Sequence, residues 1–255
     1  MKRIVAVIPA RMGSTRFPGK PLALLLGRPM IEHVFRRAMM CDVLEAVYVA
    51  TCDEEIRSAV EGFGGSVLMT SATHERASDR VAEAAELLHA DIVVMIQGDE
   101  PLITAGMIEA AVAPMLSDNA VGCVNLVHRL GNQSEYLDPN TIKVVMNVNH
   151  DALYFSRSPI PAGEFDSAGS LPVFKQVCVI PFRRDFLREF AALPPTPLER
   201  AESIDMLRLL EHGFSVRLVE TEVHTHAVDT PEDLRLVETL MKNDPLISKY
   251  EDVVA

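Results

Sequence analysis

The chain has 255 residues, 48% of them hydrophobic and 24% charged, which is ordinary for a globular α/β enzyme. Its formal net charge of −12 argues against binding along a nucleic-acid backbone, and no apolar run reaches the ~20 residues that span a membrane. The four cysteines form no C-x-x-C pair and no secretory cleavage site is visible, so we expect a cytoplasmic protein without membrane or nucleic-acid partners.

The first feature along the chain is an apolar run at 4–8, which predicts a buried strand. It leads directly into a basic loop at 9–21 that contains two glycines and the cations Arg11, Arg16 and Lys20. Glycines let a backbone approach an anion closely, and the basic side chains supply charge. The loop is not a P-loop, because five residues separate its glycines and a proline follows the lysine. It predicts a phosphate-binding loop of another kind.

Apolar runs then alternate with segments of helical periodicity. Strands are predicted over 47–50, 67–69, 92–96, 122–127 and 144–146, and helices over 30–40, 54–62, 79–89 and 105–116. This βαβ alternation predicts a largely parallel sheet with helices on both faces.

The pattern changes after about residue 150, where an irregular stretch rich in Pro, Gly and Ser begins. We expect one domain over 1–255 that carries an inserted subdomain at about 150–195, suited to dimer contacts or to a substrate lid; a long surface loop is the alternative. Further along, strands are predicted over 174–182 and 215–219, and helices from 183, over 198–211 and over 231–241.

Two aspartates are candidates for metal ligands. Asp99 directly follows the strand at 92–96, at the sheet edge where α/β proteins bind ligands, and Mg²⁺ prefers such oxygen ligands. The alternative is a turn, because Gly, Asp and Pro together favour turns. Asp229 precedes Thr230 and Pro231 and could equally be a helix N-cap. Two distant aspartates facing one magnesium triphosphate would form an economical site.

Other polar residues leave alternatives open. Ser78 and Arg80 could approach a nucleotide, or belong to a capped helix start with a solvated arginine. Lys143 and Arg157 could bind the acid group of an acceptor, or be surface charges. His226 and its neighbour at 224 lack a third metal ligand, so we predict no metal site there. No nucleophilic triad is visible, and phosphoryl transfer requires none.

With these motifs the chain resembles the 3-deoxy-manno-octulosonate cytidylyltransferases over nearly its whole length. The resemblance rests on the residues at 8–11, 14–21, 97–101, 152–157 and 228–234. It implies a Rossmann-like nucleotidyltransferase fold with a small dimerisation insertion, a homodimer, Mg²⁺ dependence and a cytoplasmic location. It also implies CTP and an acidic sugar as substrates.

The resemblance assigns roles to individual residues. Lys20, Arg11 and Asp99 would be catalytic, and Asp99 and Asp229 would hold Mg²⁺. The nucleotide would be bound by Pro9, Ala10, Arg11, Ser14, Lys20, Ser78, Arg80, Gln97 and Gly98, and the acceptor by Lys143, Tyr154, Arg157 and Gln176.

Departures from the family pattern fall mostly on the acceptor side. The family's His-x-Ser-Gly-Thr-Asp-Arg reads here with Arg76 and Ala77, its Lys-His-Leu-Gly-Ile-Tyr lacks the His, Gly and Tyr at 175–180, and the segment at 225–227 lacks the family's glycines. The resemblance as a whole implies transfer of CMP from CTP to a 3-deoxy-ulosonic acid with release of pyrophosphate, and the departures keep other acceptors open. The alternatives are another acidic acceptor, such as an amino-ulosonic or nonulosonic acid, or a non-catalytic nucleotide-binding protein.

Overall fold

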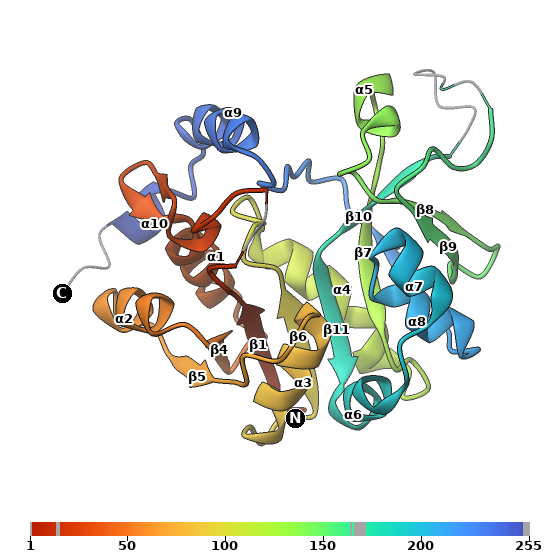
Figure 1. The fold of residues 1–255 in the computed structure, drawn as a ribbon, viewed down its shortest axis with the longest axis horizontal. Coiled ribbons are helices and arrows are strands. Elements are labelled where there is room, and N and C mark those ends of the chain that lie inside the picture. Colours follow the sequence, from red (N-terminus) through yellow and green to blue (C-terminus); the bar gives the residue numbers. More distant parts are fainter. Residues whose placement is uncertain (1, 14–15, 164, 166–171, 252–255) are drawn as a thin grey trace. The chain divides into compact units, whose positions relative to one another are not determined.

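The computed structural model describes residues 2–13, 16–163, 165 and 172–251, which form two compact units (Figure 1). Unit 1 comprises Met1–Glu109 and Thr225–Ala255, and unit 2 comprises Ala110–His224. The chain therefore leaves unit 1 within helix α4 (Ala105–Ser117) and re-enters it after His224. Unit 2 includes residues 150–195, whose role as a dimerisation insertion stays a prediction.

Unit 1 is built on a parallel sheet. Its strands lie in the order β6, β1, β4, β5, and their bounds are β1 (Ile4–Pro9), β4 (Ala46–Thr51), β5 (Val67–Met69) and β6 (Ile92–Ile96). β6 and most of β1 are buried along their length, as expected for strands covered on both faces.

The helices of unit 1 connect its strands on both sides of β1. α1 (Met30–Met39) and α2 (Glu54–Gly62) connect β1 to β4 and β4 to β5, whereas α3 (Ala77–Glu86) leads back to β6 on the other side of β1 (Figure 1). Right-handed crossovers therefore place α3 on the opposite face from α1 and α2. The predicted parallel sheet with helices on both faces is confirmed. The strand order reverses between β1 and β6, and α/β proteins bind ligands at such a switch point.

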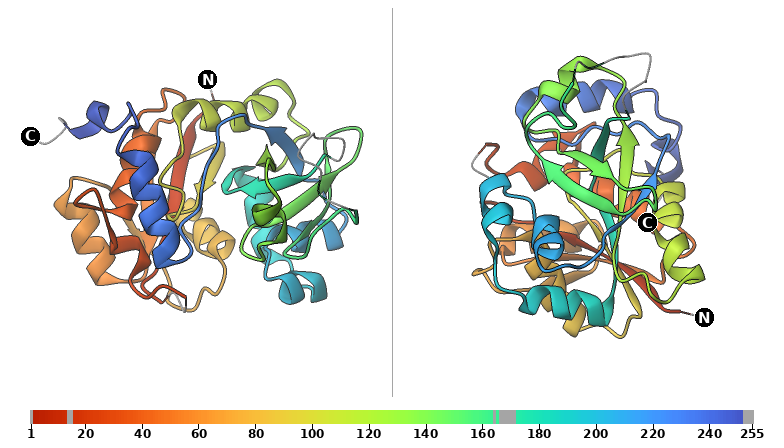
Figure 2. Two further views of the ribbon diagram at one scale, coloured as in Figure 1. Left: turned by 90° about the horizontal axis from the view of Figure 1, so that it is seen from above. Right: turned by 90° about the vertical axis from the view of Figure 1, so that its right-hand side faces the viewer.

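The C-terminal part of unit 1 packs beside its N-terminal segments (Figure 2). α9 (Pro231–Met241) buries Val237 and Met241 against Leu25 and Met30. Four short elements complete the unit, namely η1 (Lys20–Leu22), β2 (Leu24–Leu25), β3 (Arg28–Pro29) and α10 (Ser248–Glu251). This packing holds the segment before α9 next to the first loop.

Unit 2 has a sheet of its own, which the sequence did not predict. Its strands lie in the order β12, β7, β10, β8, β9, and only the β12–β7 pair is parallel. The bounds are β7 (Val124–Arg129), β8 (Lys143–Met146), β9 (Ala152–Ser156), β10 (Phe174–Val177) and β12 (Arg217–Glu220). The expectation that 122–127 and 144–146 extend the parallel sheet is therefore wrong, because an apolar run does not reveal which strand it will pair with.

Two predicted elements of unit 2 are each divided. The strand expected over 174–182 is interrupted at Cys178, so that β11 (Val179–Arg183) is separate from β10. The helix expected over 198–211 breaks at Ser203, whose φ of 56° ends α7 (Pro197–Glu202) before α8 (Met206–Glu211) begins. A non-glycine residue in the left-handed region gives no sequence signal. α5 (Gln133–Leu137) and α6 (Arg184–Ala192) complete the unit.

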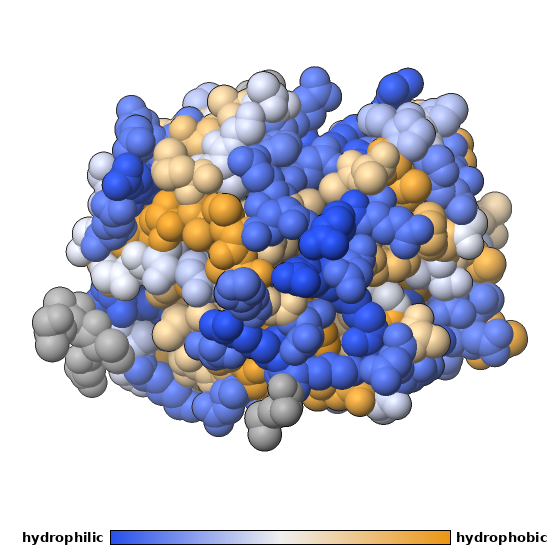
Figure 3. Space-filling view, turned by 90° about the horizontal axis from the view of Figure 1, so that it is seen from below, coloured by the Kyte–Doolittle hydropathy of each residue, from blue (hydrophilic) through white to orange (hydrophobic). Residues whose placement is uncertain are grey.

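The surface mixes polar and apolar side chains. On the face drawn in Figure 3, apolar patches lie between hydrophilic residues. Leu24, Leu87 and Val148, which belong to three different segments, are each more than half exposed. All four cysteines have free thiols. Among the described residues, no helix is long and apolar enough to cross a membrane.

Candidate active site

The loop after β1 closes on itself and ends at Lys20. Ala10 N donates to Ala50 O at 2.9 Å, which carries the β1–β4 pairing past the end of the strand. Gly19 N donates to Met12 O at 3.3 Å, and Gly19 has a φ of 72°. Glycine adopts this left-handed conformation without strain. Lys20 follows at the first position of η1.

The turn after β6 lies close to the end of β1. A Cβ at Gly98 would be 3.1 Å from Ile31 Cδ1 and 3.4 Å from Pro9 O, so a side chain there would crowd both neighbours. Gln97 O accepts a hydrogen bond from Glu100 N at 3.2 Å, which closes the turn around Asp99. The sequence motif at 97–101 is thus both a turn and the support of Asp99.

Asp229 is not the N-cap of α9. Thr230 has that position, and its side chain accepts from Asp233 N at 3.2 Å while Asp233 Oδ2 accepts from Thr230 N at 2.8 Å. Asp233 Oδ2 also accepts from Asp229 N, and Val228 N donates to Asp99 O at 2.9 Å. The N-cap alternative for Asp229 is therefore wrong, and its carboxylate is available for other contacts.

His226 supports the same capping box. Its Nε2 donates to Asp233 Oδ1 at 2.7 Å. Burial alone would raise the pKa of Asp233, but the hydrogen bonds from His226, Thr230 and the neighbouring backbone N–H groups bring it below its usual value. The T-x-x-D spacing of the box is legible in the sequence, whereas nothing in the sequence assigns His226 to it.

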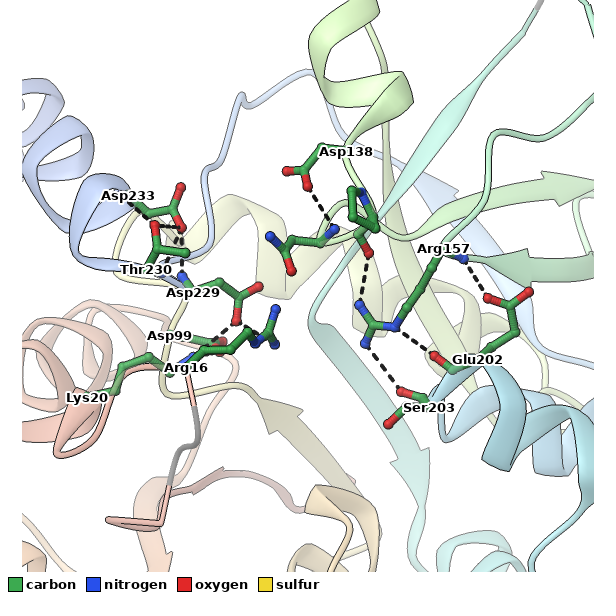
Figure 4. A network of polar contacts seen from close by, with 12 residues as sticks. Arg16, Lys20, Asp99, Asp138, Arg157, Glu202, Ser203, Asp229, Thr230 and Asp233 are labelled. Carbon is green, nitrogen blue, oxygen red and sulfur yellow. Dashed lines mark hydrogen bonds and ion pairs between the residues drawn. The ribbon is translucent and has the colours of Figure 1, made fainter.

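Three segments of unit 1 meet at Lys20 (Figure 4). Its Nζ lies 2.5 Å from Asp99 Oδ2 and 3.5 Å from Asp229 Oδ1, and Arg16 Nη2 lies 3.0 Å from the same Asp229 oxygen. The side chains of Lys20, Asp99 and Asp229 are 14%, 17% and 19% exposed. Burial would lower the pKa of Lys20, but the two carboxylates outweigh it and raise that pKa. Because Asp99 Oδ2 and Asp229 Oδ1 both contact the Lys20 ammonium, the two carboxylates lie close to each other.

The carboxylate pair fits a divalent cation that is shared with a substrate. Among the residues that the structure describes, no group of three or more His, Cys, Asp or Glu could hold a metal by itself. Mg²⁺ is usually bound by one or two carboxylates together with water and substrate phosphates, so two aspartates suffice. The Lys20 ammonium already shows that both carboxylates can face one cation.

The remaining nucleotide candidates differ in exposure. Arg11 is exposed, and Ser14 lies outside the described residues. Ser78 and Arg80 are buried, and the Arg80 guanidinium donates to Thr70 Oγ1 at 2.5 Å and to Cys52 Sγ at 3.5 Å. Arg80 is thus not the solvated arginine of the alternative interpretation.

Lys143 is fully buried in unit 2 and is not a surface charge. Its Nζ donates to the carbonyls of Asp138, Thr141 and Arg157 at 2.6–2.7 Å. Burial is the main cause that lowers the pKa of Lys143 to about 8, and the Arg157 charge adds to it. The contact of Lys143 with an acceptor stays a prediction, because in this conformation its ammonium binds the chain itself.

Arg157 contacts Glu202, a residue that sequence reasoning missed (Figure 4), and Tyr154 belongs to the same network. The Glu202 carboxylate accepts from Arg157 N at 2.8 Å, Ser156 Oγ at 2.9 Å and Tyr154 OH at 3.5 Å. The Arg157 guanidinium donates to the carbonyls of Glu202 and Pro139 at 2.7 and 3.0 Å. No motif marks Glu202, because its role depends on the break after α7.

Gln176 is held by a neighbouring amide on the same face of the unit 2 sheet. Its Nε2 donates to Asn125 Oδ1 at 2.6 Å, and Asn125 Nδ2 donates to Val177 O at 2.9 Å. Asn125 is fully buried. The amide of Gln176 therefore has a fixed orientation, and its contact with an acceptor stays a prediction.

In unit 1, a basic glycine loop and two carboxylates meet at the switch point of a parallel sheet, which is the arrangement of a nucleotidyltransferase. The family model described as cytidylyltransferase matches residues 5–223. The 3-deoxy-manno-octulosonate cytidylyltransferase of Geobacter metallireducens is 47% identical over 250 residues, which cover 94% of this chain and 98% of that protein. The same enzyme of Geobacter sulfurreducens is 47% identical over 243 residues, covering 92% and 97%. The chain belongs to this family of 3-deoxy-manno-octulosonate cytidylyltransferases.

Solved structures agree with this assignment. A structure of CMP:2-keto-3-deoxy-manno-octonic acid synthetase complexed with CTP matches with a TM-score of 0.86 and 41% identity, over 94% of this chain and 98% of that one. A cytidylyltransferase from Leptospira borgpetersenii matches with a TM-score of 0.66 and 18% identity, over 98% and 94%, and so shares the fold.

Proposed function

We propose that the protein transfers CMP from CTP to the anomeric hydroxyl of a 3-deoxy-ulosonic acid, 3-deoxy-manno-octulosonate or a close relative, and releases pyrophosphate. The observation that carries the proposal is the meeting of Lys20, Asp99 and Asp229 at the switch point of unit 1. The relatives' names supply the acceptor class, and the relative solved with CTP supplies the nucleotide.

In the proposed reaction the acceptor hydroxyl oxygen attacks the α-phosphorus in line. A bond forms between that oxygen and phosphorus, the bond from phosphorus to the pyrophosphate oxygen breaks, and the hydroxyl proton passes to solvent. The contribution of the protein is positioning and charge neutralisation, which supply most of the rate in phosphoryl transfer. Lys20, Arg11 and Arg16 would neutralise the triphosphate and the leaving group.

We assign Asp99 and Asp229 as the residues that hold Mg²⁺. The ion would neutralise charge on the phosphate oxygens when bound. Lys20, which pairs with both carboxylates here, would then turn its ammonium toward the triphosphate. Asp233 and the capping box of α9 would keep Asp229 in place during this exchange.

One observation favours a second candidate acceptor, another acidic sugar. The chain has Gln176 and Cys178 where the family pattern has His and Gly, and Gln176 is bound to Asn125. An amino-ulosonic or nonulosonic acid would meet an amide there instead of an imidazole. A homodimer and a cytoplasmic location are further proposals that rest on the family resemblance.

The test is a matrix of the four nucleoside triphosphates against a panel of acidic sugars, with Mg²⁺ present and pyrophosphate as the readout. We expect release only with CTP and an ulosonic acid, and the acceptor with the highest kcat/KM defines the substrate. Binding of CTP without pyrophosphate release for any acceptor would instead identify a non-catalytic nucleotide-binding protein. Equal release with UTP would overturn the base assignment.

A further inference from the structure

Asp53 occupies the N-cap position of α2 but does not cap it. Its backbone has the extended N-cap conformation, with φ −102° and ψ 121°, where aspartate usually accepts a hydrogen bond from the first turn. Here the side chain makes no capping hydrogen bond. Asp53 Oδ2 instead accepts from Met12 N at 2.8 Å, 41 residues earlier in the chain. The carboxylate therefore serves the loop after β1.

Met12 links Asp53 to the residue that precedes Lys20, because both backbone groups of Met12 form hydrogen bonds. While its N–H is bound by Asp53, its carbonyl accepts from Gly19 N at 3.3 Å. Gly19 directly precedes Lys20, whose own N–H donates to Phe17 O at 3.2 Å. One carboxylate thus fixes the start of the loop and, through the two bonds of Met12, the residue before Lys20.

Asp53 itself stands on a rigid support. Its N–H donates to Thr51 Oγ1 at 3.1 Å, and Thr51 is fully buried at the end of β4. The neighbouring residue Ala50 accepts from Ala10 N, so the end of β4 is also bound to the first residue after β1. Asp53 is therefore held in place by the buried end of β4, and Met12 is held by Asp53.

We propose that Asp53 is a positioning residue for the nucleotide, which holds Met12 and, through it, Gly19, so that the adjoining Arg11 and Lys20 meet the triphosphate. This inference rests on the proposed function, because it concerns the same nucleotide site. A carboxylate near a triphosphate site repels the ligand, so its contribution must come from the bond to Met12 N. Hydrogen bonds with an ionised acceptor are about twice as strong as neutral ones.

The experiment measures CTP affinity by calorimetry without an acceptor, in the wild type and in Asp53→Ala and Asp53→Asn. Loss of a hydrogen bond to a charged group predicts about tenfold weaker CTP binding for Asp53→Ala. Asp53→Asn keeps an oxygen that accepts from Met12 N, so most of the affinity should return. In steady-state assays the KM for CTP should rise while the KM for the acceptor stays unchanged.

Asp91→Ala is the matched control. The Asp91 carboxylate accepts from Arg3 N at 2.7 Å, the same kind of bond at the opposite end of β1. This variant should bind CTP as the wild type does. Wild-type affinity in Asp53→Ala, or equally weak binding in both control and test variants, overturns the proposal. If wild-type protein binds no CTP, the proposed function fails first, and that result is distinct because it does not depend on Asp53.

Discussion

The Lys20 ammonium lies 2.5 Å from Asp99 Oδ2, so a cation from the first loop is paired with a carboxylate 79 residues later. The same ammonium also reaches Asp229 from the C-terminal part of unit 1. The lysine therefore stands where a divalent cation shared by the two aspartates would stand. At the proposed magnesium site, the ammonium and the metal ion would compete for one pair of carboxylates.

This competition predicts two opposite effects of Lys20→Gln. Without nucleotide, the variant should bind Mn²⁺ several-fold more tightly than the wild type, because the carboxylates no longer face a bound cation. Its turnover should fall by roughly two orders of magnitude, because the triphosphate loses a charged partner. Free Mn²⁺, followed by electron paramagnetic resonance, and pyrophosphate release measure the two effects. Arg57→Gln, which removes exposed ion pairs on α2, should change neither. Weaker Mn²⁺ binding in Lys20→Gln would refute the competition.

The Asp99→Asn variant should lose turnover but keep the fold. The Asn side chain is nearly isosteric but carries no charge, so we expect turnover to fall by about two to four orders of magnitude, in the range of lost electrostatic stabilisation. The hydrogen bond from Val228 N involves the Asp99 carbonyl and survives the change, so the fold should persist. Activity is measured by pyrophosphate release and the fold by circular dichroism. Near-normal turnover would remove the metal assignment.

The Asp233→Asn variant should show that the charge of Asp233 in the capping box stabilises the protein in a pH-dependent way. The pKa of Asp233 is below its usual value, so its stabilisation is present above about pH 4, the unfolded pKa, and is lost as pH falls through the folded pKa. The variant should therefore be less stable than the wild type at pH 7, with a difference that shrinks below pH 4. Its turnover should also fall several-fold, because Asp229 N loses a charged acceptor.

Urea unfolding at pH 7 and at pH 3 measures this difference. Glu232→Gln is the control, since Glu232 lies in the same first turn of α9 but is exposed and paired with Arg235 at 3.0 Å. A constant gap between Asp233→Asn and the wild type at both pH values would show that the charge of Asp233 is not responsible.

The position of the first loop and of Asp99 at one edge of the sheet could be predicted from sequence, because each directly follows a strand of a parallel sheet whose strand ends meet at that edge. Asp229 could not be separated from an N-cap, since Asp and Thr are both good capping residues and stand side by side. The structure resolves this, because Thr230 forms the cap.

Other side-chain contacts could not be predicted from the sequence, because they depend on the fold of distant segments. Asp53 marks the start of a helix in the sequence, but its carboxylate binds Met12 instead. The sequence leaves Lys143 either as an acceptor-binding residue or as a surface charge, yet three carbonyls surround it inside unit 2. The mostly antiparallel sheet of unit 2 and the break at Ser203 likewise arise from strand pairing and backbone conformation that no local spacing encodes.

The last prediction concerns stability and uses the buried ion pair of unit 2. Arg208 donates to both carboxylate oxygens of Glu199, at 2.6 and 2.8 Å, and the side chains are 2% and 1% exposed. Arg208→Met leaves the Glu199 charge buried without its main counter-ion, which costs about 3–5 kcal/mol of unfolding free energy. Urea unfolding followed by far-ultraviolet circular dichroism measures the change.

Two further variants test whether the loss of stability in Arg208→Met comes from the buried charge. Arg57→Met removes exposed ion pairs on α2 and should leave the free energy of unfolding nearly unchanged, because water screens exposed pairs. The double variant Glu199→Gln with Arg208→Met should recover part of the loss, because the remaining amide carries no charge to bury. If the double variant were as unstable as the sum of its parts, the cost would lie in lost packing against Phe190, over which the Arg208 guanidinium lies at 5.2 Å, and the charge argument would fail.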